Sequence, residues 1–116
     1  MAKDIELIEN ALDEEVEENG TATIKLSKPF KWEGRVYKEL NFDFDSLTGR
    51  DADRIDRECQ AAGLAVIVPG VTGAYNIRVA ANACIEPLGI DAFQAMPLRD
   101  YNKAVSAARN FLLVQG

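Results

Sequence analysis

The sequence contains no histidine, and this absence removes the side chain that most often acts as a general base near neutral pH. Catalytic triads that use histidine and most catalytic zinc sites are excluded with it. Only two cysteines are present, Cys59 and Cys84, and helical spacing places both on apolar faces, where a thiol is a small packing side chain rather than a nucleophile. We therefore expect no enzyme activity, no cofactor and no metal site.

Long apolar stretches are also missing, since none approaches the ~20 residues that a membrane-spanning helix needs. The first residues, Met1 to Asp4, lead into acidic sequence instead of the apolar core of a secretory signal. We therefore expect an intracellular protein with no membrane partner, in which both cysteines stay reduced.

Bases are outnumbered by acids, 13 against 19, and the net charge is −6. Eight of the acids and one base, Lys3, lie within residues 1–20, so this segment carries −7 and the remaining residues together carry +1. Residues 1–19 are predicted to be a flexible acidic leader, and residues 20–116 a single domain. A nearly neutral domain has little basic surface for phosphate contacts, so we expect no nucleic-acid partner.

Alternation of polar and apolar residues predicts two strands between residues 21 and 44. The apolar positions that share one face are Ala22, Ile24 and Leu26 in the first strand and Val36, Leu40, Phe42 and Phe44 in the second. Pro29 and Gly34 punctuate the segment between them, which predicts an antiparallel hairpin with a connection longer than two residues, spanning 28–34. Such a hairpin needs helices to cover its apolar face.

Helical spacing then predicts helices at about 48–62, 73–86, 91–95 and 98–114. Thr48 with Asp51 matches a loose capping box, and Gly63 suits the end of the first helix. Residues 64–68 fit either a short buried strand or an extended connector. The predicted fold class is α+β, a hairpin at about 21–44 packed against three to four helices.

The last predicted helix carries the most continuous apolar stripe of the chain. Such a stripe is most often core, but on a small domain a surplus of apolar helical surface favours self-association or a helical partner. The residues predicted to bind a partner are Leu98, Tyr101, Val105, Ala108, Phe111 and Leu112.

Three aromatic residues, Phe30, Trp32 and Tyr37, cluster near the hairpin connection. They fit a small satellite core under the connection, and they also fit an exposed contact patch, because aromatic side chains dominate binding hot spots. The sequence favours the first interpretation over the second and leaves both open.

The order of these segments carries a resemblance to a known family. The resembling stretches are Ile24–Phe30 with Tyr37–Leu40, Phe42–Gly49 and Met96–Leu112. Over residues 21–114 the chain resembles the tail assembly chaperones of long-tailed bacteriophages, whereas the acidic leader is not part of the resemblance.

The resemblance implies a non-catalytic function. Such chaperones bind the tape measure protein and keep it soluble until tail-tube subunits polymerise around it. The implied partners are therefore the tape measure protein, the tail-tube protein and further copies of the chain, and the implied location is the cytoplasm of the bacterial host and not the mature virion. The family has no catalytic residues to transfer.

Two other functions fit the small α+β build. One is a structural virion protein of the tail, such as a completion or connector subunit, which would remain in purified particles. The other is a small acidic inhibitor of a nucleic-acid-binding protein, which would need carboxylates in a fixed array.

The leader itself has some helical spacing, through Ile5, Ile8, Leu12 and Val16. We hypothesise that it competes with a client for the apolar stripe of the last helix.

Overall fold

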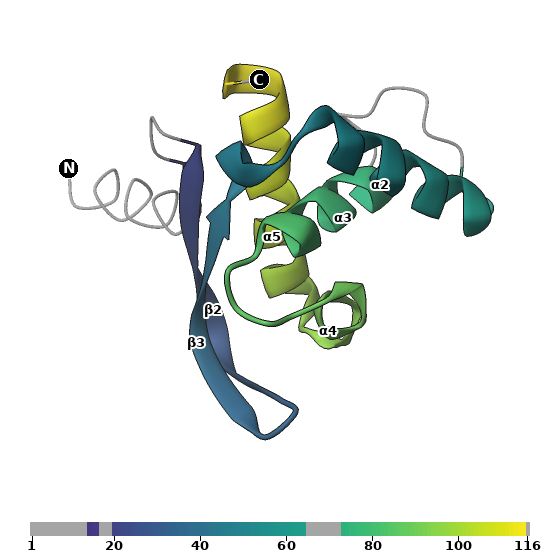
Figure 1. Ribbon diagram of the computed structural model, residues 1–116. Coiled ribbons are helices and arrows are strands. Elements are labelled where there is room, and N and C mark those ends of the chain that lie inside the picture. Colours follow the sequence, from purple (N-terminus) through teal and green to yellow (C-terminus); the bar gives the residue numbers. More distant parts are fainter. Residues whose placement is uncertain (1–13, 17–19, 65–72, 116) are drawn as a thin grey trace.

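The first half of the chain forms a sheet built around a long hairpin. The computed structural model describes residues 14–16, 20–64 and 73–115 (Figure 1). Strand β2 (Thr21–Trp32) pairs antiparallel with β3 (Arg35–Asp43). A third strand, β1 (Glu14–Val16), pairs antiparallel with β2, so the strand order is β1-β2-β3.

The hairpin spans the predicted residues, but its first strand is longer than predicted and its turn is shorter. Trp32 pairs with Arg35, so Glu33 and Gly34 alone form the connection, with φ angles of 49° and 82°. Positive φ at both positions is the geometry of a type I′ turn, which matches the right-handed twist of the strands. The predicted long connection over 28–34 is therefore wrong.

Pro29 is the reason for this error. A proline usually marks the end of a strand because it has no N–H group for the ladder. Here it lies within a register shift between Lys25 and Phe30, where the regular pairing of β2 with β3 is interrupted. The strand therefore continues past the proline to Trp32.

Alternation is confirmed for the inner half of the hairpin. The buried residues there are Ala22, Ile24, Leu40 and Phe42. Val36, which was predicted to share their face, is instead 59% exposed, because after the register shift it pairs with Lys31 on the face opposite Phe30 and Trp32, whose rings pack against the core. The turn of the hairpin extends beyond the helices (Figure 1). Phe44 is buried as predicted, but it belongs to the 3-10 turn η1 (Phe44–Ser46) and not to the strand.

The second half of the chain is helical, and this confirms the predicted α+β fold class. The helices are α2 (Gly49–Ala61), α3 (Gly73–Ala83), α4 (Ile90–Ala95) and α5 (Leu98–Asn110), and α5 continues into a short π-helix, η2 (Phe111–Gln115). For residues 64–68 the sequence left a short strand and an extended connector open. Residues 65–68 lie outside the described residues, so both interpretations stay predictions.

Both predicted ends of α2 are confirmed. At its start, the backbone N–H and the hydroxyl of Thr48 donate to Asp51 Oδ2 over 2.8 and 3.2 Å. At its end, Gly63 has a φ of 76°, and the N–H groups of Gly63 and Leu64 donate to the carbonyls of Gln60 and Cys59. These two bonds form a Schellman motif, which glycine favours because it has no Cβ.

Helix α3 lies at the centre of the helical layer. It contacts α2, α4, α5, η1 and β3, and it buries most of its own surface. Small residues allow α3 and α5 to approach closely, and the buried ones are Ala80 and Ala83 on α3 and Ala104, Ala107 and Ala108 on α5. The predicted stripe of the last helix is therefore core over its central part.

The segment after α3 completes the sheet instead of extending the helix. Cys84 forms an antiparallel bridge with Phe42, and the N–H of Ile85 donates to the carbonyl of Asn41 over 2.8 Å. The N–H and side-chain amide of Asn41 donate to the two carboxylate oxygens of Glu86. The helix predicted at 73–86 thus ends at Ala83, because the next residues pair with the free edge of β3.

Part of the predicted leader differs from expectation. Glu14–Val16 form β1, so their backbone belongs to the sheet. Residues 1–13 and 17–19 lie outside the described residues, and the division into leader and domain stays a prediction. Within the described ranges, no helix is both long and apolar enough to cross a membrane.

Candidate functional site

The six residues predicted to bind a partner do not form one surface. Val105 and Ala108 are buried in the core. Leu98 lies at the first turn of α5 and is 72% exposed, whereas Phe111 and Leu112 lie at the opposite end and are half-buried. Tyr101, one turn after Leu98, is also half-buried. The structure therefore divides the stripe into an exposed start, a core centre and a half-buried end.

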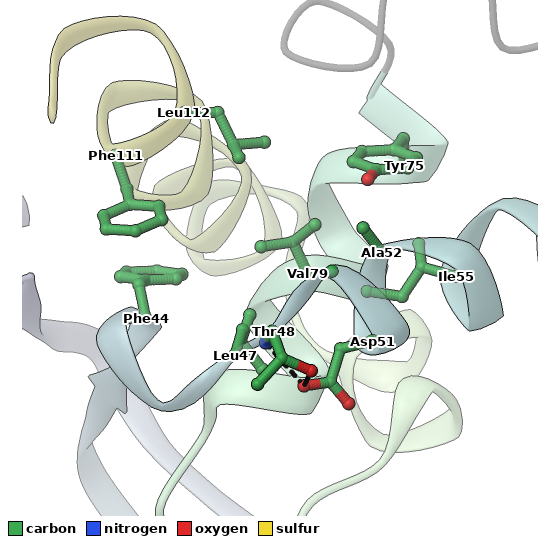
Figure 2. A pocket seen from close by; sticks show the side chains of 11 residues that line it. Phe44, Leu47, Thr48, Asp51, Ala52, Ile55, Tyr75, Val79, Phe111 and Leu112 are labelled. Atoms are coloured by element: carbon green, nitrogen blue, oxygen red, sulfur yellow. Dashed lines mark hydrogen bonds between the residues drawn. The ribbon is translucent and has the colours of Figure 1, made fainter. Parts of the chain in front are cut away.

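The half-buried end forms one wall of an apolar cavity of about 210 Å³, shown in Figure 2. Four elements meet around it, namely η1, the first turn of α2, α3 and the end of the C-terminal helix. The lining residues are Phe44, Leu47, Thr48, Gly49, Asp51, Ala52, Ile55, Tyr75, Val79, Phe111 and Leu112. We call this cavity the apolar groove.

The walls of the apolar groove are held by aromatic and aliphatic contacts. The rings of Phe44 and Phe111 stack with their centroids 5.2 Å apart and their planes 19° from parallel. Figure 2 shows the side chains of Leu112 and Val79 between this pair and Tyr75. Because an apolar cavity of roughly 150 Å³ takes up a benzene-sized group, the groove has room for one large apolar side chain.

The polar residues of the groove are tied to each other at its rim. Thr48 donates twice to Asp51, and the backbone N–H of Thr48 is the main reason why the pKa of Asp51 is lowered. A carboxylate that is already satisfied by local donors does not need a ligand. Since Thr48 and Gly49 are exposed, the groove is reached from the surface at this rim.

Sequence reasoning identified only one wall of the groove. Phe111 and Leu112 were among the predicted contact residues, whereas Leu47, Ile55 and Val79 look like ordinary core positions of separate elements. Only the tertiary arrangement brings them together. The π-helical turn that presents Phe111 and Leu112 has no sequence signal of its own, although such turns occur frequently at functional sites.

A buried carboxylate was also missed. Helical periodicity assigns Asp100 to the polar side of α5, but it is fully buried and accepts hydrogen bonds from the backbone N–H and the hydroxyl of Ser27 over 2.8 and 3.0 Å. Ser27 lies within the register shift of β2, where its N–H has no regular ladder partner. Asp100 therefore anchors the start of α5 to the hairpin, and its role is structural.

Neither cysteine has the environment of a nucleophile. Burial raises the pKa of Cys59, and burial followed by the charge of Glu86 raises the pKa of Cys84 to about 12. The reactive form of a thiol is the thiolate, which is scarce when the pKa is raised. Across the described part of the chain, no group of three acidic or thiol side chains is placed to hold a metal ion.

Comparison with known proteins adds no family to this description. Neither a protein-family model, nor a curated protein, nor a solved structure matches the chain. The functional argument therefore depends on the residues of the chain itself.

Proposed function

We propose that this protein is a non-catalytic tail assembly chaperone of a long-tailed bacteriophage. It would bind the tape measure protein, keep it soluble and help to recruit tail-tube subunits in the cytoplasm of the bacterial host, and it would be absent from the mature virion. The resemblance over residues 21–114 motivates the proposal. The α+β fold and the apolar groove support it.

The apolar groove is the observation that carries the proposal. A long amphipathic helix presents large apolar side chains every three to four residues along one face. The groove has the size and the apolar lining to receive one such side chain, and Phe111 and Leu112 form the wall nearest the end of the chain's last helix. A client of this kind matches the groove better than a polar small molecule does.

The expected strength of this contact is suited to a chaperone. Burial of one large apolar side chain contributes about 1.5–3 kcal/mol, which corresponds to roughly 10- to 150-fold in affinity. One groove therefore holds a client weakly and reversibly. Many copies bound along a long client would hold it firmly through multivalency and would still release it locally to tail-tube subunits.

The test is co-expression with a candidate tape measure protein. We expect the tape measure protein to move from the insoluble to the soluble fraction and to co-purify with the chaperone. Leu112→Glu should abolish this effect, because it places a charge in the groove. Leu113→Glu is the matched control, since Leu113 is the neighbouring residue, is 56% exposed and does not line the groove.

The proposal is rejected if the cognate tape measure protein stays insoluble with the wild-type chain. Purified particles give a second test, which separates a chaperone from a structural tail protein. We expect the chain to be absent from them, and stoichiometric retention would favour a completion or connector subunit.

A further inference from the structure

The hydroxyl of Tyr75 stands apart from the other polar side-chain groups that line the apolar groove. Thr48 donates to Asp51, and Asp51 also accepts from Arg54, so these side chains satisfy one another. Tyr75 is only 7% exposed, yet no hydrogen bond joins its hydroxyl to another residue that the structure describes. A tyrosine hydroxyl that is largely buried usually has a partner, so this one points to a ligand.

This hydroxyl faces into the apolar groove. Tyr75 lies in the first turn of α3, and Figure 2 shows its oxygen on the side of the ring that faces Ala52 and Val79, which both line the groove. The ring of Tyr75 is one of three aromatic rings in the lining, with those of Phe44 and Phe111. Such walls favour an aromatic guest, because aromatic pairs contribute more than the area that they bury.

The surroundings of the Tyr75 hydroxyl favour a guest that donates a hydrogen bond. Burial, followed by the negative charge of Asp56, raises the pKa of Tyr75, so the phenol is neutral at pH 7. Its oxygen accepts a hydrogen bond, and the nearby carboxylate disfavours a guest that presents a further acceptor. A cationic donor is disfavoured as well, because the lining is apolar and burial of a charge is costly.

The size of the groove distinguishes between the neutral aromatic donors. Its volume of about 210 Å³ exceeds the roughly 150 Å³ that takes up a benzene ring, so it has room for a bicyclic ring. The indole of tryptophan is bicyclic, and its N–H is a donor with no acceptor beside it. A tryptophan side chain therefore fits the volume, the aromatic walls and the free hydroxyl.

This protein does not supply such a tryptophan from a second copy. Trp32 is its only tryptophan, and its ring stacks on Phe30 with the centroids 5.9 Å apart and packs against the core. A second copy would have to disrupt its own hairpin to offer Trp32. The guest therefore comes from a different protein.

We propose that the apolar groove binds a tryptophan side chain of a helical protein partner, and that Tyr75 determines this specificity by accepting a hydrogen bond from the indole N–H. The inference rests on the proposed function for the source of the tryptophan, which would be the tape measure protein. The recognition of indole itself can be measured without that client.

The experiment is a titration of the full-length protein with indole and with benzothiophene, which has the same bicyclic shape and no N–H. Methyl NMR signals of Val79 and Leu112 report binding in the groove. Tyr75→Phe keeps the ring and removes the hydroxyl. We expect it to weaken indole binding about three- to tenfold relative to benzothiophene, which is the effect of one neutral hydrogen bond.

Two variants control the titration. Tyr37→Phe makes the same chemical change at a tyrosine that does not line the groove, and it should leave both affinities unchanged. Leu112→Glu places a charge in the groove and should abolish the binding of both compounds. Binding of benzothiophene to Tyr75→Phe shows that the groove of this variant is intact.

A pair of helix-forming peptides tests whether the guest is a protein side chain. One peptide has a single tryptophan on its apolar face, and the other has phenylalanine at that position. We expect the tryptophan peptide to displace indole and to bind more tightly than the phenylalanine peptide, with a smaller difference in Tyr75→Phe. Indole binding that the tryptophan peptide does not displace would overturn docking of a partner and would leave a small-molecule site.

The proposal is overturned if Tyr75→Phe changes the affinities for indole and benzothiophene by the same factor, or if neither compound shifts the signals of Val79 and Leu112. These outcomes are distinct from failure of the proposed function. A tape measure protein that stays insoluble would reject the chaperone, whereas the titration measures the selectivity of the groove directly.

Discussion

Asp100 shows how a single residue can hold two parts of this fold together. It lies in the first turn of α5, where a negative charge is favourable near the helix N-terminus, and it satisfies both donors of Ser27 on β2. A polar residue in an amphipathic helix is ordinarily assigned to solvent. The sequence could not show that an irregularity in a distant strand leaves a backbone donor that needs this carboxylate.

Asp100→Ala should lower the free energy of unfolding by about 2–3 kcal/mol, because it removes two charge-assisted hydrogen bonds and leaves a strand N–H without a partner. Ser27→Ala should cost only about 1 kcal/mol, since the backbone N–H keeps its bond. Urea denaturation measures the free energy of unfolding of both variants. The control Asp53→Ala, at an exposed position beyond the first turn of α2, should change stability by less than about 0.5 kcal/mol. A result for Asp100→Ala within that margin would contradict the anchoring role.

The cap of α2 predicts a pH dependence. Hydrogen bonding from Thr48 holds the pKa of Asp51 below its ordinary value of 3.8, so folding favours the ionised carboxylate. This contribution to stability is fully present above the unfolded pKa and is lost as the pH falls through the lower, folded pKa.

Asp51→Asn should therefore be less stable than wild type at pH 7, and the difference should narrow as the pH falls below about 4. Thermal unfolding across the pH range measures this. Asp53→Asn removes the same charge from the same helix without touching the cap. If the stability difference between Asp53→Asn and wild type also narrows at low pH, the effect comes from net charge and not from the cap.

The hairpin turn is an element whose sequence is not matched to its geometry. Both Glu33 and Gly34 have positive φ, and a type I′ turn prefers asparagine or aspartate at the first of these positions. Glutamate in this region is strained, which explains why the sequence did not signal a two-residue turn.

Glu33→Asn should accordingly raise the free energy of unfolding by about 0.5–1 kcal/mol. Glu33→Gln is the matched control, because it removes the same charge without a preference for positive φ. Chemical denaturation compares the two. Equal stabilisation by both variants would assign the effect to charge and contradict the turn geometry.

The helices could be predicted closely because their ends carry local signals. Thr48 with Asp51 and the glycine at position 63 set the limits of α2, and Pro97 precedes α5. The end of α3 was missed because its cause is not local. The residues after Ala83 pair with the free edge of β3, and no helical pattern in the sequence reports a strand edge.

The exposure of two apolar residues could not be predicted from the sequence either. Val36 and Leu98 fit the periodicity of a buried face, but the register shift in β2 leaves Val36 on the face away from the core, and Leu98 lies exposed at the first turn of α5. Periodicity indicates which residues share a face. It does not indicate how far the neighbouring element covers that face.

The apolar groove belongs to the whole molecule. Its walls come from η1, α2, α3 and η2, which are separated along the chain, so only their packing creates the cavity. The sequence predicted a contact surface along the whole last helix. The structure assigns the centre of that stripe to the core and leaves its two ends, at Leu98 and at Leu112, as competing candidates for partner binding.

The most direct measurement is the affinity of the purified chain for an immobilised helical segment of the tape measure protein, by biolayer interferometry. We predict that Leu112→Glu weakens binding at least about 10-fold, whereas Leu98→Glu and Leu113→Glu stay within about twofold. Circular dichroism tests whether each variant is folded. If Leu112→Glu does not fold, the milder Leu112→Ala takes its place. Loss of binding in Leu98→Glu with full binding in the folded Leu112 variant would contradict the account.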